Sequence, residues 1–412
     1  MSQPVAIADR KHNIVSAVDQ LAVKLVSTSH QIHDKPEIGN EEFFASETLT
    51  TLLAANGFSI ERGVAGHETS FVARKHSGKE GPVIGYLAEY DALPGLGHAC
   101  GHNIIGTASC GAAIALSSVL DETGGEVVVF GTPAEEGGPN GSAKGSFVKA
   151  GLFEGVDACM MVHPFNRTTQ TGKTLAVDPL DFEFKGRSAH AAASPEDGIN
   201  ALDGVIQLFN GINALRQHVT DDVRIHGIIT HGGDAPNIVP DYAKARFYIR
   251  AATREACNEV TKKVKAIAEG SALATGTKLN VIKIQNEVDH FQLNRRFDKV
   301  FQRSIESLGE YFDDTERKGL GSSDAGNVSR VVPTIHPYIK IGPESLVVHT
   351  NEFRDAAKST EGDRALVIGA KALALTGYEL LTDKQLLEGI WEEFSSGNKD
   401  GKTAKSGLSF FV

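Results

Sequence analysis

The sequence predicts an α/β fold in which a mixed sheet flanked by helices is interrupted by a smaller, inserted α+β domain. Apolar runs at 83–88, 126–131 and 157–162 each end in a loop or in ligand-type residues, and helical segments separate them. Between 180 and 290 the order becomes strand, helix, strand, strand, helix, strand, which is that of a ferredoxin-like unit. We therefore expect one domain built from 1–179 and 291–412, with 180–290 inserted into it.

Composition narrows the classes of function. The 412 residues carry a formal net charge of -11, with 41% hydrophobic and 23% charged residues, and the sequence pI is about 5.8. An acidic chain is a poor partner for nucleic acid or an anionic membrane. The four cysteines follow no disulfide spacing, the first residues do not resemble a signal peptide, and no apolar run reaches the roughly 20 residues of a membrane span. We expect a soluble, cytoplasmic enzyme.

Two helices open the chain. Apolar residues recur at helical spacing over 13–32, and a turn at Pro36 leads to a second helix over 41–56. His33, Glu37 and Glu41 are polar residues in or next to this connection. They could belong to a site, although a polar loop between helices accounts for them equally well.

The stretch from Gly85 to Gly106 is the centre of the prediction. Its strand gives way to a loop broken by proline and glycines, where α/β proteins commonly place their chemistry, and a small-residue helix follows over 110–119. Four potential ligand side chains lie in the loop: Asp91, His98, Cys100 and His102. Taken singly, each is explained as a core or loop residue. Cys-x-His, however, places a thiolate and an imidazole within reach of one metal ion, and it also suits a nucleophile with its base.

Two further strands end in side chains of the same kind. The run at 126–131 leads into a glycine-rich loop with Glu135 and Glu136, and the run at 157–162 ends at His163. Adjacent glutamates are usually solvated surface residues. At the end of a buried strand each needs a partner, because burying an unpaired carboxylate costs several kcal/mol. Ligand-type residues at three strand ends predict one site at the carboxyl edge of a single sheet.

The remaining elements are read from the same periodicities. In the insert, strands are expected at 180–187, 242–251 and 278–284, with another over 223–231, and helices at 198–218 and 254–271. After the insert, helices at 294–310 and 360–376 flank the segment V-V-H-T-N-E-F, which contains His349.

A family resemblance rests on the residues that fit this site, namely Cys100, His102, Glu136, His163 and His349, with Glu135 beside them. Their order, split by an inserted ferredoxin-like domain, resembles that of the M20 metallopeptidase and amidohydrolase family. The matching motifs are A-E-Y-D-A-L-P, H-A-C-G-H, P-A-E-E-G, V-H-P, G-R-S-A-H-A-A-A-S-P, A-P-N-I-V-P-D and V-H-T-N-E-F. The cysteine is typical of the amidohydrolase branch. Asn103 and Ile105, where C-G-H-D-x-H is commonest, make the chain more similar to p-aminobenzoyl-glutamate hydrolases and M20-domain dipeptidases.

The resemblance implies a metal-dependent exopeptidase fold and two divalent ions, zinc or manganese or else cobalt. Cys100, His102, Glu136, His163 and His349 would be their ligands. Glu135 would be the general base that deprotonates a water shared by the ions and then protonates the leaving amine. The substrate would be the amide of an N-acyl or N-aroyl amino acid or of a dipeptide, with an Xaa-Arg or β-alanyl dipeptidase as the alternative.

The resemblance also assigns roles outside the ligand set. His190 would reach across a homodimer, formed through the inserted lid and dimerisation domain, to stabilise the developing oxyanion; otherwise it merely covers its own surface. Asn237 and Arg250 are weaker candidates for holding the substrate carboxylate. Asp91 would orient a ligand imidazole or simply cap the loop. His98 is taken as structural.

Two other functions are consistent with parts of the pattern. Cys100 could be a covalent nucleophile with His102 as its base, but that chemistry does not explain Glu136, His163 and His349. The chain could also be a binding protein without catalysis. A complete ligand set with Glu135 beside it favours the enzyme, because an inactive homologue has no chemical reason to keep the base.

Overall fold

The structure, a computed structural model, describes residues 3–315 and 321–397. Within these ranges the chain forms two compact units. The first, called here the main unit, comprises 3–173, 291–315 and 324–397, and the second, called the insert, comprises 174–290 with Gly321–Ser323. The insert thus begins a few residues before position 180, because its first strand is longer than its alternating pattern indicates.

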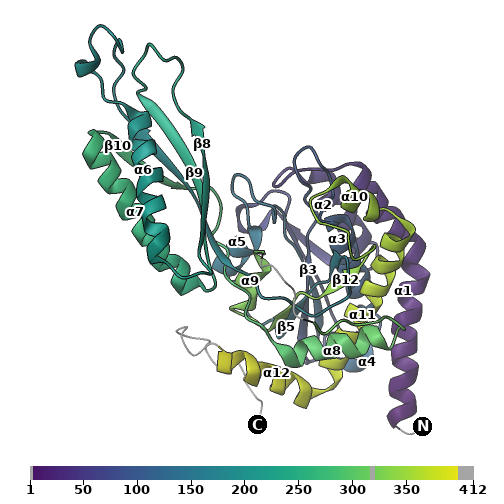
Figure 1. Cartoon of the computed structure of the whole chain (residues 1–412). Coiled ribbons are helices and arrows are strands. Elements are labelled where there is room, and N and C mark those ends of the chain that lie inside the picture. The colour runs from purple at the N-terminus through teal and green to yellow at the C-terminus, as the bar shows by residue number, and fades with distance from the viewer. Residues whose placement is uncertain (1–2, 316–320, 398–412) are drawn as a thin grey trace. The chain divides into compact units, whose positions relative to one another are not determined.

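The main unit is built on a mixed sheet whose parallel half positions the site (Figure 1). β3 pairs in parallel with both β4 and β5, and β11 extends this half, whereas β2 and β1 add an antiparallel edge beyond β4. In spatial order the strands are β1 (Ser59–Arg62), β2 (Phe71–His76), β4 (Glu126–Gly131), β3 (Val83–Ala88), β5 (Ala158–Met160) and β11 (Thr334–Ile335). A small parallel pair, β6 (His163–Phe165) with β12 (Tyr338–Lys340), lies apart from it.

Both faces of the sheet are buried at its central strands, β3 and β4, which is why these strands are largely apolar runs. Alternate residues of β4 enter different cores: Val127 and Val129 join one apolar cluster, and Val128 and Phe130 join another. The helices of the main unit are α1 (Gln3–Asp34), α2 (Phe43–Ala54), α3 (His102–Ser117), α4 (Leu120–Thr123), α5 (Ala143–Lys149), α8 (Arg295–Glu306), α9 (Ala325–Ser329), α10 (Asn351–Ala356), α11 (Thr360–Thr382) and α12 (Lys384–Gly397).

The helix α11 is long and apolar enough to cross a membrane by length and composition alone, but 72% of its apolar window is buried inside the protein. It packs against α1, α3 and α8. Its hydrophobic character therefore follows from its place in the core.

The insert is a four-stranded antiparallel sheet with two helices. Its spatial order is β10 (Lys278–Lys283), β7 (Ala176–Lys185), β9 (Tyr242–Ala251) and β8 (Arg224–His231), and the helices are α6 (Ala201–Leu215) and α7 (Arg254–Thr275). Every second residue of β9 is buried, and both helices pack against β9 and β7. This is the ferredoxin-like arrangement that the order of segments predicts, and it confirms the fold class.

Some element bounds differ from those predicted. The helix α3 begins at His102, not at 110, because the glycine-rich loop ends one residue earlier, at Gly101. α1 begins at Gln3, ten residues before the predicted start, and the second helix begins only at Phe43. α12 had no counterpart among the predicted helices.

Candidate metal centre

The ligand-type residues come together because the strands that precede them are neighbours. β4, β3 and β5 are adjacent and parallel, so their carboxyl ends meet at one edge of the sheet. Glu135 and Glu136 follow β4, and His163 follows β5. Cys100 lies in the connection from β3 to α3, and His102 is the first residue of α3. His349 comes from the loop before α10.

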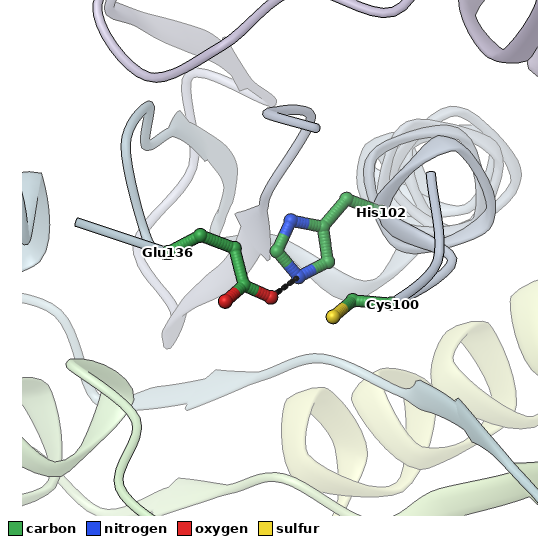
Figure 2. A group of neighbouring side chains, drawn as sticks. All are labelled: Cys100, His102 and Glu136. Atoms are coloured by element: carbon green, nitrogen blue, oxygen red, sulfur yellow. Dashed lines mark ion pairs between the residues drawn. The ribbon is translucent and has the colours of Figure 1, made fainter. Parts of the chain in front are cut away.

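Three predicted ligands form one compact cluster, which Figure 2 shows from inside the fold. The ligand atoms of Cys100, His102 and Glu136 all lie within 4.8 Å of one another. His102 Nε2 is 3.8 Å from Glu136 Oε1, and His349 Nε2 is 3.7 Å from the same oxygen. The ring of His163 stands edge-on to that of His102, with centroids 6.0 Å apart. The structure therefore gathers all five predicted ligands.

His102 and His163 each turn one ring nitrogen away from the cluster. His102 Nδ1 lies 3.0 Å from Asp91 Oδ1, and His163 Nδ1 lies 2.7 Å from the carbonyl oxygen of Pro164. When the ring is neutral, as a metal-binding imidazole must be, each contact suits an N–H donor at Nδ1 and leaves Nε2 free for the metal ion. His102 Nε2 is buried without a hydrogen-bond partner, which is what an open metal-binding nitrogen requires. Asp91, expected either to orient an imidazole or to cap its loop, thus contacts a candidate ligand.

Backbone geometry brings three of the side chains into place. Gly101, between Cys100 and His102, has φ +75°, and a Cβ there would lie 2.8 Å from the Pro164 ring. Only glycine meets both demands, so this residue allows the thiol and the imidazole to project from one tight turn. His349 itself has φ 64° and donates its amide to the carbonyl oxygen of Ala99, which ties its loop to the same turn.

The donor set fits divalent first-row cations. Sulfur, imidazole nitrogen and carboxylate oxygen are the ligands that zinc and manganese-type sites use. Burial disfavours the ionised form of Glu136, but the contacts with His349 and His102 outweigh it and lower its pKa. Burial, reinforced by Glu136 and other carboxylates, raises the pKa of the Cys100 thiol, so an anionic sulfur here needs a cation beside it.

Glu135 points into a second group, although it is adjacent to Glu136 in the chain. Its carboxylate lies within 4.8 Å of the ligand atoms of Glu89 and Asp324. The cation of this group is Lys144, whose Nζ is 2.7 Å from Glu89 Oε1 and 2.6 Å from Asp324 Oδ1. Glu89, Lys144 and Asp324 are all at most 1% exposed.

In this second group Glu135 holds its proton more tightly than an ordinary glutamate does. Burial, then the charges of Glu89, Glu136 and Asp324, raise its pKa well above the usual value. Glu89 behaves oppositely: burial disfavours its charge, but Lys144 and then His102 lower its pKa to about 2. A raised pKa in one carboxylate next to ionised neighbours is the pattern of a proton-transfer group.

Four buried polar residues around the site escaped the sequence prediction, namely Glu42, Glu89, Lys144 and Asp324. Glu89 stands inside the motif A-E-Y-D-A-L-P, so that motif was itself a signal, and Asp324 lies in the glycine- and serine-containing segment S-S-D-A-G-N-V-S. Glu42 and Lys144 look like the surface charges of ordinary helices. Only the fold shows that both are fully buried.

The other candidates lie outside the cluster. His98 is buried next to His33, with ring centroids 6.0 Å apart, and it is not among the grouped ligand residues. Asn237 and His190 are neighbours in the insert, where Ala191 donates its amide to the carbonyl oxygen of Asn237. Arg250 lies on β9 and donates from Nη1 to Ser322 Oγ at 2.7 Å. The proposed roles of these insert residues stay predictions.

Comparisons with known proteins agree with this fold. A model of the peptidase dimerisation domain of M20 proteins matches residues 180–275, which lie within the insert. The Xaa-Arg dipeptidase of Mus musculus is 34% identical over 399 residues, covering 93% of this chain and 92% of that protein. One of the subunits of the p-aminobenzoyl-glutamate hydrolase of Escherichia coli is 36% identical over 318 residues, covering 72% and 65% of the two chains.

A solved structure shows the same architecture. A Bacillus subtilis protein, described as a dinuclear metal-binding peptidase of the M20 family, superposes with a TM-score of 0.63 at 21% identity. The superposition covers 88% of this chain and 99% of that one. At this identity the match shows a shared fold, from the main sheet through the insert.

Proposed function

The chain belongs to the M20 peptidase family and is a hydrolase of its amidohydrolase and dipeptidase type, and we propose that it removes the C-terminal residue of dipeptides by metal-dependent amide hydrolysis. One observation carries the mechanism. Two adjacent glutamates diverge, so that Glu136 joins a cysteine–histidine cluster while Glu135 joins a group of buried carboxylates beside it. One binds cations and the other is left to move protons.

The cations that the cluster would hold are two divalent ions, and zinc, manganese and cobalt all suit its donors. We assign Cys100, His102, Glu136, His163 and His349 as the ligands. When bound, such ions supply Lewis acidity, polarising an amide carbonyl and acidifying water. They also stabilise the anionic forms of the cysteine and the glutamates, which burial alone disfavours.

Glu135 performs the proton transfer. Its carboxylate accepts a proton from the attacking water and returns it to the amide nitrogen as the C–N bond breaks, so the products are a carboxylic acid and an amine. The raised pKa of Glu135 suits both halves of this transfer, because a group with an ordinary glutamate pKa would release the proton too readily to deliver it to the amine.

We also propose that two copies of the chain form a homodimer through the insert. β8 is an edge strand of the insert sheet, and Ile228 and Ile229 on it are 63% and 45% exposed. Exposed apolar side chains on an unpaired edge favour pairing with a second copy. Size-exclusion chromatography with light scattering should show a dimer that Ile228→Lys weakens; a stable monomeric wild type would contradict it.

His190 is suited to stabilising an oxyanion from the insert. Its exposed ring accepts at Nδ1 from the amides of Ala192 and Ala193, at 3.3 and 3.1 Å. A neutral ring that accepts at Nδ1 carries its proton at Nε2, where it is free to donate to the oxygen of a reacting amide. His190→Ala should lower kcat about 100-fold or more while metal content stays unchanged.

The substrate class is tested with a panel of small amides. We expect Xaa-Arg dipeptides to be cleaved fastest, because the dipeptidase similarity spans nearly both whole chains; p-aminobenzoyl-glutamate, β-alanyl dipeptides and N-acetyl amino acids complete the panel. Each is assayed with Zn²⁺, with Mn²⁺ and after chelation. Chelation should abolish hydrolysis, and the metal should restore it.

The same panel tests the alternative in which Cys100 is a nucleophile. A reactive cysteine needs a lowered pKa, whereas the surroundings of Cys100 raise it. Hydrolysis by fully demetallated protein, lost on thiol alkylation, would establish that alternative and overturn the metal mechanism. Metal loading without cleavage of any member would instead indicate a binding protein.

A further inference from the structure

The segment 39–42 cradles the loop that carries Glu135, although it lies far from that loop in the sequence. A Cβ on Gly39 would lie 2.8 Å from Ala134 Cβ and 2.9 Å from the carbonyl oxygen of Gly137. Asn40 Nδ2 donates to the carbonyl oxygens of Pro139 and Asn140, at 3.0 and 3.1 Å. The chain entering α2 is thus packed onto both sides of the glutamate pair.

The strongest contact in this cradle is made by Glu42. Its side chain is fully buried, and Oε1 accepts the amide hydrogen of Ala134 at 2.9 Å. Oε2 accepts from Thr69 Oγ1 at 2.8 Å, which holds the carboxylate in that orientation. Neither oxygen caps α2, because the Glu42 side chain makes no capping hydrogen bond to the first turn of that helix.

Ala134 needs such support because of its backbone. It has φ 56°, a left-handed conformation that costs an alanine free energy and persists only where the surroundings enforce it. This turn sets the direction in which the next residue, Glu135, leaves the backbone. Past Glu135, Asp91 Oδ2 accepts the amide hydrogen of Glu136 at 3.0 Å. Two buried carboxylates therefore hold the amides on either side of Glu135.

We propose that Glu42 is a positioning residue for Glu135: it fixes the left-handed turn at Ala134 that aims the general base. The inference rests on the proposed function for what Glu135 does. The two carboxylates then have different roles. Asp91 also contacts His102 and so aligns a ligand, whereas the hydrogen bonds of Glu42 go to Ala134 and Thr69 and to none of the five proposed ligands. Loss of Glu42 should impair proton transfer without loss of metal.

Two conservative variants separate positioning from charge. Glu42→Gln keeps the length and the acceptor oxygen, and Thr69 can turn its hydroxyl to accept from the new amide. Glu42→Asp keeps the charge but is one methylene too short to reach Ala134. We expect Glu42→Asp to lower kcat about 10- to 100-fold with KM and metal content within about twofold of wild type, because sub-ångström misplacement of a catalytic group has effects of this order. Glu42→Gln should retain most of kcat, and Glu41→Ala, at the exposed neighbour, should match wild type.

A second readout does not depend on activity. Hydrogen exchange of the Ala134 amide, followed by mass spectrometry in the metal-free and metal-loaded full chain, should be at least about 10-fold faster in Glu42→Asp and near wild type in Glu42→Gln. If wild type hydrolyses no amide, the proposed function fails while the exchange result still decides the role of Glu42.

The proposal is overturned if the kcat values of the two Glu42 variants do not follow the expected order. If Glu42→Gln is as impaired as Glu42→Asp or worse, charge rather than position is what matters. If Glu42→Asp leaves kcat and the exchange of Ala134 unchanged, or loses metal in place of kcat, Glu42 is not a positioning residue for the base.

Discussion

Each unit contains a cluster in which lysine pairs with at least one buried carboxylate, and the two clusters differ in their ratio of positive to negative charges. In the main unit Lys144 pairs with both Glu89 and Asp324, and Glu135 lies within 4.8 Å of both carboxylates. His102 Nε2 also lies 3.7 Å from Glu89 Oε2. In the insert Lys244 shares Asp181 with Arg246, at 2.7 Å from each cation, and the two cations are 24% and 42% exposed at their side chains. The insert group is balanced in charge and its cations reach water, whereas the main-unit group is buried and short of positive charge.

We expect this difference to distinguish a structural ion-pair network from a functional one. Asp181 has a lowered pKa because its cations outweigh the effect of burial. Glu135, with one shared lysine for three carboxylates, has a raised pKa. Because the main-unit group is short of positive charge, metal ions bound at the neighbouring cluster would stabilise its carboxylates. Burying these charges costs free energy, and such an arrangement is typical of sites where the chemistry requires it.

The largest expected effect comes from removing the lysines. Lys144→Met should destabilise the protein by about 3–5 kcal/mol, because it leaves buried carboxylates without their cation. Lys244→Met should cost about 1 kcal/mol or less, since Asp181 keeps Arg246 and water reaches the site. Denaturant unfolding of both variants measures this difference, and equal costs would erase the distinction between the groups.

Metal removal should affect the two units unequally. Ions present at 100 times their dissociation constant stabilise the protein that binds them by about 2.7 kcal/mol. Chelation should therefore speed hydrogen exchange in β3, β4 and the loops after them, and leave the sheet of the insert unchanged. Equal loss of protection in β7 and β9 would place metal binding elsewhere.

The pH dependence of stability should have opposite signs at Glu42 and Asp181. Burial, then the charge of Asp91, raises the pKa of Glu42 from 4.5 to about 7, so the folded metal-free protein binds the proton more tightly and stability falls as pH rises through this window. Asp181 has a lowered pKa, so its contribution is present near neutral pH and is lost as pH falls below about 4.

Urea unfolding between about pH 2 and 8 checks these signs, because the Asp181 contribution is lost only below about pH 4. Glu42→Gln should remove the loss of stability between about pH 4.5 and 7, and Asp181→Asn should remove the loss in acid. A Glu42→Gln protein with the same slope as wild type would contradict the raised pKa.

Much of the fold could be predicted from the sequence, and the reason lies in particular segments. The residues from Val127 to Phe130 are all apolar because both faces of β4 are buried there, and the bounds of β4, Glu126–Gly131, match those predicted. The insert was recognisable from the order of its elements. The predicted start of α3 was wrong because His102 and the small residues after it carry no amphipathic stripe: every residue of the helix is buried.

The candidate site likewise contains residues that the sequence could predict and residues that it could not. Cys100, His102, Glu136 and His163 follow strands, so adjacency in the sheet gathers them. Lys144 and Glu42 could not be assigned, because a single charged residue in a helical segment is ordinarily solvated, and only tertiary packing shows what it faces. Charge balance is a property of the assembled group, which no local pattern encodes.

The adjacent glutamates offer the most direct test of the mechanism. Metal content by plasma mass spectrometry and turnover of an Xaa-Arg dipeptide should be measured for wild type, Glu135→Gln and Glu136→Gln. We predict that Glu135→Gln keeps the metal content of wild type while losing about 100- to 10,000-fold in kcat, and that Glu136→Gln loses metal. If Glu135→Gln retains turnover, or if it loses metal while Glu136→Gln keeps it, the division of work between the two side chains is wrong.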